Sequence, residues 1–187
     1  GNVTSPTAAM AVRLPWQPVP GWWTGTRLRA TYAEGFRAPT FNELFFPGFG
    51  NPNLDPERSS EWNTGFDVEL LDGRGLVYAT YFDRRVKDDI VTVLVDPDTF
   101  EFAPTNLGRV DATGVETGVD VDLGAGFRCG GTYTYLGITS NGGADQVTRR
   151  PNNQMSSFVA WRTPQVFSDA DAFQARVDVF FVGDRPD

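Results

Sequence analysis

Apolar and polar residues alternate with a period of two over stretches of about ten residues. Between residues 61 and 71, Trp62 and Phe66 fall on one face, whereas Asp67 and Glu69 fall on the other. Three further stretches share this pattern: 114–124, 127–135 and 173–181. A helix would place apolar residues three and four positions apart, and these stretches do not. They therefore predict β-strands with one apolar and one polar face.

Four further stretches bring the expected number of strands to roughly eight. The stretch 27–32 alternates in the same regular way, whereas 76–83 and 153–163 are less regular and 8–14 is the weakest of the four. In 76–83, Val77, Ala79 and Tyr81 interrupt the expected polar face. Strands of soluble proteins commonly have about five or six residues, whereas a tilted membrane-crossing strand needs about 9–11. The longer stretches, in which charged positions alternate with large apolar ones, favour a wall between lipid and water.

The connections between these strands alternate in length. The short or compact ones cover 15–24, 71–75, 123–126 and 164–172, and the long ones cover 35–60, 85–112 and 140–151. Transmembrane β-barrels have short turns on the periplasmic side and long loops outside. The order of connections therefore predicts antiparallel, up-and-down strands of such a barrel.

Aromatic residues gather where the strands are expected to end. The residues concerned are Trp16, Trp22 and Trp23 at one end, and Tyr32, Phe36 and Trp62 at the other. Amphipathic rings settle at the headgroup level of a membrane, which explains this placement. The alternative is a soluble β-sandwich binding module, such as a carbohydrate-binding domain, with these rings in its core. Partitioning into the outer-membrane fraction would separate the two interpretations.

The composition of the chain argues against several classes of function. A net charge of −8 argues against nucleic acid as a partner, because phosphate binding needs clustered Lys and Arg. The absence of histidine and the single cysteine, Cys129, leave no nucleophile–base set and weaken the case for a zinc or iron site. Acidic residues around Asp96, Asp98 and Glu101 are interpreted as solvated loop residues. We therefore expect no enzyme activity, no cofactor and no metal site.

The connection 35–60 carries a motif in two parts. Residues 35–44 read G-F-R-A-P-T-F-N-E-L, and residues 50–59 read G-N-P-N-L-D-P-E-R-S. The pair closely resembles the barrel signature of TonB-dependent outer-membrane receptors, in particular the cobalamin and siderophore transporters. Residues 81–90, 106–108 and 114–116 resemble later segments of the same barrel.

The resemblance implies a barrel of about 22 strands that is plugged by an N-terminal domain. Residues 1–187 would then be part of the barrel domain, without the plug. The implied function is energised uptake of a siderophore, a corrinoid or a similar large metal-bearing ligand across the outer membrane of a Gram-negative cell. The implied partners are the outer-membrane lipid and, through the plug, TonB with its inner-membrane complex.

The motif residues have mainly structural roles in this interpretation. They are Phe36, Arg37, Ala38, Pro39, Asn51, Pro52, Asn53, Leu54, Pro56, Glu57 and Ser59. Pro39 lacks an amide donor and ends strand pairing, while Asn51-Pro52 and Asp55-Pro56 set consecutive turns. Glu57 and Ser59 can accept from backbone N–H groups at re-entry to the sheet. Arg37 and Glu43 are expected to pair inside the lumen.

Two groups of residues are candidates for contact with a ligand. Four phenylalanines in the long connection, Phe41, Phe45, Phe46 and Phe49, are able to stack on a flat ligand or, alternatively, to pack the loop onto the barrel mouth. Polar residues expected to line the water-filled wall are Arg27, Arg29, Asn63, Asp67, Glu69, Glu116, Asp120 and Asp122.

Overall fold

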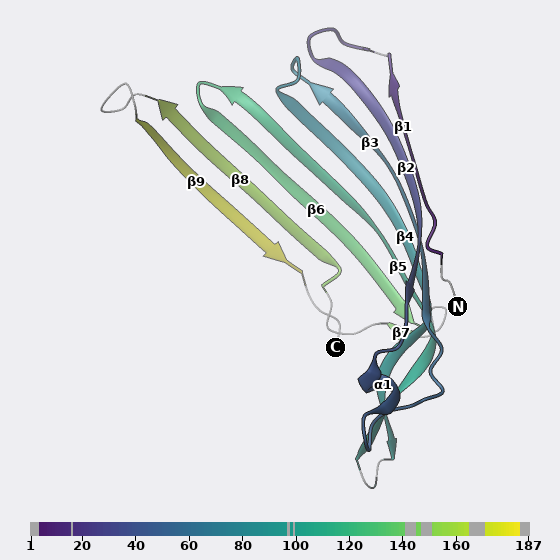
Figure 1. Cartoon of the computed structure of the whole chain (residues 1–187). Helices are drawn as coiled ribbons and strands as arrows, with labels where there is room; N and C mark the ends of the chain where they lie inside the picture. The colour runs from purple at the N-terminus through teal and green to yellow at the C-terminus, as the bar shows by residue number, and fades with distance from the viewer. Residues whose placement is uncertain are drawn as a thin grey trace.

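The computed structural model describes residues 4–15, 17–96, 98, 100–140, 145–146, 151–164 and 171–183. The described residues form a single antiparallel sheet and one short helix (Figure 1). The elements are β1 (Thr7–Leu14), β2 (Trp23–Arg37), α1 (Phe41–Phe45), β3 (Glu57–Leu70), β4 (Gly75–Asp96), β5 (Glu101–Gly124), β6 (Phe127–Ser140), β7 (Asp145–Gln146), β8 (Asn153–Pro164) and β9 (Ala172–Val182).

Each long strand pairs with the next one along the chain. The order in the sheet is β1-β2-β3-β4-β5-β6-β8-β9, and the two-residue β7 pairs with the end of β6. The predicted all-β, up-and-down architecture with roughly eight strands is therefore confirmed. The sheet is curved and open, with β1 and β9 at its two edges (Figure 1).

The strand register separates an apolar face from a polar one. Cross-strand partners point to the same side of a sheet, and neighbouring residues of a strand point to opposite sides. Leu28 lies opposite Phe66, and the row continues through Ala79 and Thr117 to Tyr133. The adjacent row runs from Arg27 through Asp67 to Tyr78. All eight residues predicted to form the polar wall share the second face.

The predicted orientation of one segment of β4 is wrong, because the residues expected to interrupt the polar face lie on the apolar face. Val77, Ala79 and Tyr81 lie opposite Val68, Phe66 and Thr64, so they extend the apolar face. Tyr78 and Phe82 consequently lie on the polar face, where apolar rings were not expected.

Glycine accounts for these rings on the polar face. Tyr78 is the cross-strand partner of Gly118, and Phe82 is the partner of Gly114. Each ring lies where a Cβ at the glycine would be, so both glycines are buried beneath aromatic atoms. Phe158 covers Gly130 in the same way. A ring that lies flat on a glycine covers backbone and keeps its apolar surface from water.

The expected long loop at 85–112 is mostly strand, which corrects the prediction. β4 continues to Asp96 and β5 begins at Glu101, so the two strands form a hairpin that projects beyond the rest of the sheet (Figure 1). The charged residues from Asp83 to Asp89 obscured the alternation, but the following run of Ile, Val and Thr favours extended backbone.

The other connections agree with the predicted alternation where they are described. The turns β3–β4 and β5–β6 lie at one end of the sheet, while α1 and the β4–β5 hairpin lie at the other (Figure 1). Trp16, most of 140–151 and most of 164–172 lie outside the described residues. No helix among the described residues is both long and apolar enough to cross a membrane.

The soluble β-sandwich alternative is wrong, because no second sheet covers the apolar face in the described part of the chain. The accessible surface is 12711 Å². A compact protein of this mass would expose about 8,900 Å². Large apolar side chains such as Phe66, Val119 and Val177 are exposed. An apolar face of this extent needs a non-aqueous partner.

Candidate functional site

The polar face is a network of paired charges. Arg27 donates from Nε to Oδ2 of Asp67 at 2.8 Å, and Arg29 donates to Oδ1 of the same carboxylate at 3.2 Å. Asp67 is buried, and two guanidinium groups offset the cost of removing its charge from water. Arg29 also donates to the hydroxyl of Thr80 on β4. These contacts join β2, β3 and β4 across one face.

The same kind of pairing continues toward β9. Arg128 donates twice to Asp120, at 2.7 and 2.9 Å. Arg176 pairs with Asp178 at 2.7 Å, and its guanidinium stacks on the ring of Phe158 at 4.0 Å. Such a surface is suited to contact with water and polar solutes, in contrast to the opposite face.

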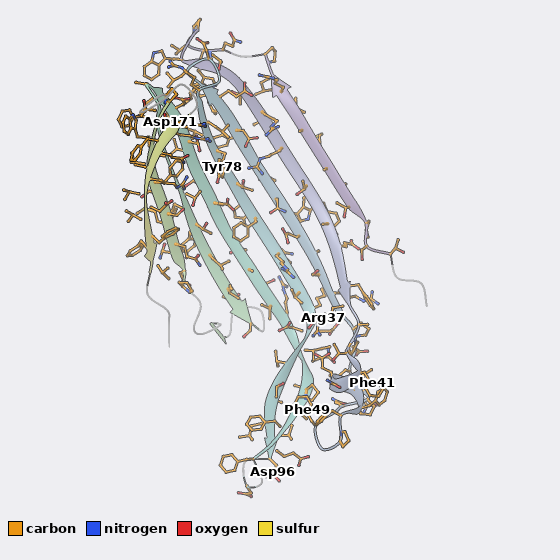
Figure 2. The ribbon with its side chains drawn as sticks, turned by 60° about the vertical axis from the view of Figure 1, so that its left-hand side comes forward. Arg37, Phe41, Phe49, Tyr78, Asp96 and Asp171 are labelled. Atoms are coloured by element: carbon orange, nitrogen blue, oxygen red, sulfur yellow. The ribbon has the colours of Figure 1, made fainter. Side chains whose placement is uncertain are left out.

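Arg37 holds together the first part of the motif. Its Nε donates to Oε2 of Glu57 at 2.7 Å, and its Nη1 donates to both carboxylate oxygens of Glu43, at 3.1 and 3.2 Å. Glu57 also accepts from the backbone N–H of Ile90 at 2.9 Å. One guanidinium therefore links the end of β2, the start of β3 and α1, and Glu57 extends the link to β4 (Figure 2). The predicted contact between Arg37 and Glu43 is present.

A capping box starts α1. The backbone N–H of Glu43 donates to the Thr40 hydroxyl at 3.3 Å, and the Thr40 N–H donates to Glu43 at 2.6 Å. The hydrogen bond from the Thr40 N–H, together with Arg37, lowers the pKa of Glu43 even though burial acts in the opposite direction. Glu43 is therefore ionised and paired at neutral pH. The sequence Thr-Phe-Asn-Glu carries this signal, which the sequence analysis missed.

The second part of the motif is fastened to the β4–β5 hairpin. Asn51 donates to the carbonyl of Pro104 at 3.0 Å, while its Oδ1 accepts from the N–H of Asn53 at 3.0 Å. Asn106 accepts from the N–H of Asp55 at 2.9 Å and donates to the Asp55 carbonyl at 2.9 Å. Pro104 and Asn106 therefore belong to the site, although only the register of the unexpected hairpin brings them there.

The remaining motif residues shape the backbone around these contacts. Leu54 is buried beneath the segment, and Ser59 lies against Gly35 on the neighbouring strand. Phe36 points to the apolar face and Pro39 follows the end of β2. Ala38, Pro52 and Asn53 are exposed, and Pro56 directly precedes β3.

The four loop phenylalanines form two ring pairs. Phe41 and Phe45 lie 5.3 Å apart, and Phe46 and Phe49 lie 6.5 Å apart with their rings nearly perpendicular. Phe41 is 73% exposed, and Phe45 and Phe46 are also exposed, whereas Phe49 is half-buried. Figure 2 shows Phe41 directed away from the strands. Three rings are consequently open to a solute.

In the described part of the chain, the acidic residues do not form a metal site. No group of three or more Cys, Asp or Glu side chains among the described residues has the geometry to hold an ion.

The whole chain, residues 1–187, matches the model of a family described as TonB dependent receptor-like, beta-barrel. The chain belongs to this family. Its members are outer-membrane receptors and transporters, not enzymes. A curated relative, the vitamin B12 transporter BtuB of Photobacterium profundum, is 29% identical over 157 residues, which cover 78% of this chain and 24% of the relative. The chain thus spans about a quarter of the length of that relative.

Solved structures of outer-membrane receptors share the fold of this family member. The siderophore receptor PirA from Pseudomonas aeruginosa has a TM-score of 0.65 at 17% identity, covering 95% of this chain and 33% of that one. The alcaligin receptor FauA from Bordetella pertussis has a TM-score of 0.59 at 16% identity, covering 91% and 30%. The open sheet is therefore a portion of the barrel of this family.

Proposed function

We propose that the protein takes up a large, scarce, metal-bearing solute, such as a siderophore or corrinoid, across the outer membrane. Its apolar face contacts the lipid and its polar face lines the lumen. Uptake is driven by TonB and its inner-membrane complex acting on a plug domain. The observation that supports this most is the pairing of a charged face with a largely apolar one in a chain of this receptor family.

The exposed rings on α1 are the proposed contact for the solute. Aromatic rings cover the apolar surface or stack on the flat parts of such ligands. The contacts of Arg37, Glu43 and Glu57 fix α1 relative to the strand ends. The backbone that carries Phe41 and Phe45 is therefore fixed in place. A held ring loses little conformational entropy on binding.

The proposed ligand contact predicts that replacing Phe41 and Phe45 together with alanine weakens ligand binding by about tenfold, because two aromatic rings that contact the ligand are removed. The measurement is binding of cobalamin and of a panel of ferric siderophores to the receptor of natural length. Trp22→Ala is the matched control, since this exposed tryptophan lies at the opposite end of the sheet. Normal affinity in the double variant would show that these two rings do not contact the ligand. The transport proposal would be unaffected by that result.

Transport itself is tested in cells. The receptor should fractionate with the outer membrane, and ligand accumulation should disappear when TonB is deleted. Accumulation that persists without TonB, or recovery of the receptor in the soluble fraction, would contradict the proposal.

A further inference from the structure

A strip of low charge runs along the polar face where β4, β5 and β6 lie side by side. The register groups its residues into three rows, which are Phe82, Gly114 and Leu136; Thr80, Glu116 and Thr134; and Tyr78, Gly118 and Thr132. Glu116 is the only charged residue of this β4–β6 strip. The neighbouring part of the wall, on β2 and β3, instead carries Arg27, Arg29 and Asp67. The wall is therefore divided into a charged part and a nearly uncharged part.

The polar groups of the strip already have hydrogen-bond partners within the wall. The Thr80 hydroxyl accepts from an arginine of β2, and the Tyr78 hydroxyl donates to Glu116 at 3.3 Å. The hydroxyls of Thr132 and Ser156 share a hydrogen bond of 2.8 Å. Polar groups that are satisfied within the wall have little capacity left to hold a solute in place. The strip is therefore available mainly for apolar contact.

The two aromatic rings of the strip lie close to its backbone. Tyr78 and Phe82 occupy the space that a Cβ at Gly118 and Gly114 would take, so the rings lie over the glycines. Figure 2 shows Tyr78 partway along the strands. A ring held against the backbone has little rotamer freedom to lose when another surface contacts it. The strip is thus a fixed and partly apolar surface within a polar wall.

We propose that the transported solute moves along the β4–β6 strip, with an apolar part of the solute against the two rings. The inference rests on the proposed function, which makes the polar face the wall of the lumen. An apolar surface in a water-filled lumen gains from contact with an apolar partner. Apolar contact is non-directional, so a solute can slide along the strip without breaking hydrogen bonds one by one. Movement along the charged part would require ions to lose water at each step.

A solute in transit fits the strip better than a segment of the plug that stays in place. A stationary segment is held best by directional hydrogen bonds and ion pairs. The charged part of the wall offers these, because Arg13 and Arg27 are exposed and each has more N–H groups than its carboxylate partner can use. We therefore expect the plug to be anchored on the charged part, and the solute to pass along the strip.

The test narrows the strip in the natural-length receptor. Thr132 is exposed, and Thr132→Trp places a large ring over the path. Thr31→Trp is the matched control on the polar face of β2, because each change removes one hydroxyl contact with another strand, that of Thr132 with Ser156 and that of Thr31 with Asn63. Ser156→Ala removes the contact of Thr132 without adding bulk. Cells carrying each receptor are given radiolabelled cobalamin or radiolabelled ferric siderophores, and the rate of uptake and the binding affinity are both measured.

The expected result separates the rate of uptake from affinity. Thr132→Trp should slow uptake by about tenfold, as expected when a passage is overpacked, while its affinity for the solute changes by less than about twofold. Thr31→Trp and Ser156→Ala should leave the rate of uptake within about twofold of the parent.

Four results would overturn the path along the strip. The first two are unchanged uptake in Thr132→Trp and an equal loss of uptake in Thr31→Trp. The third is an equal loss in Ser156→Ala, because the hydroxyl contact would then be the cause. The fourth is weaker solute binding or a lower free energy of unfolding in Thr132→Trp, because the strip would then hold the bound solute or the plug. None of these results affects the transport proposal, which fails instead if uptake by the parent receptor does not require TonB.

Discussion

Replacing Val119 with arginine is expected to destabilise the folded barrel by about 2–4 kcal/mol, the cost of a cation facing the middle of a bilayer. Val119 lies on the apolar face of β5, midway between Val115 and Leu123. Its exposed side chain has Val77 and Gly131 as cross-strand neighbours, and neither can neutralise a charge. The measurement is urea unfolding of the natural-length receptor in lipid vesicles.

Thr134→Arg is the matched control for this change. Thr134 lies on the polar face of β6, opposite Glu116 and Gln154, so the new cation meets a carboxylate and water. We expect the free energy of unfolding to change by less than about 0.5 kcal/mol. Similar losses for the two variants would mean that the faces do not differ in environment.

The second large effect is expected at Gly126, where alanine should cost about 2–5 kcal/mol, the sum of a backbone and a packing penalty. Gly126 has a φ of +81°, which disfavours any residue with a Cβ by about 1–2 kcal/mol. In addition, a Cβ there would overlap the carbonyl oxygen of Arg162 on β8, and overpacking adds about 1–3 kcal/mol. The backbone cannot yield easily, because the Arg162 N–H donates to the Gly126 carbonyl at 2.9 Å.

Gly124 in the same turn separates the two causes. Its φ is +79°, yet a Cβ would approach nothing closer than an Arg74 guanidinium nitrogen at 4.0 Å. Gly124→Ala should therefore show only the backbone penalty of about 1–2 kcal/mol. Comparable unfolding free energies for the two variants would show that the contact with β8 does not limit this turn.

The architecture was predictable from sequence where packing imposes a simple rule. A face against lipid accepts apolar side chains and a face against water accepts charges, so 114–124 alternates clearly, and 173–181 does so except at Phe180. The rule fails where glycine changes the geometry: Tyr78 and Phe82 on the polar face depend on Gly118 and Gly114 of the next strand. Only the register reveals those partners.

The candidate site also has some parts that the sequence predicts and others that it does not. The pair Arg37 and Glu43 follows from their proximity and opposite charge, and the cap at Thr40 was readable from its spacing to Glu43. The attachment of Asn51 to Pro104 and of Asp55 to Asn106 was not predictable, because about fifty residues separate the partners. Both contacts require the β4–β5 hairpin. This hairpin was not predicted because a run of charged residues obscured the alternation of its strands.

Site-directed spin labelling along β5 tests most directly whether the apolar face touches hydrocarbon and the polar face touches water. Cys129 is first replaced by serine, so that single labels can be placed at 115, 116, 119, 120, 121 and 122 of the receptor in vesicles. Labels at the odd positions should be relaxed by oxygen, and labels at the even positions by a water-soluble nickel complex. Accessibilities that rise and fall together along the strand, without this opposed period of two, would contradict the account.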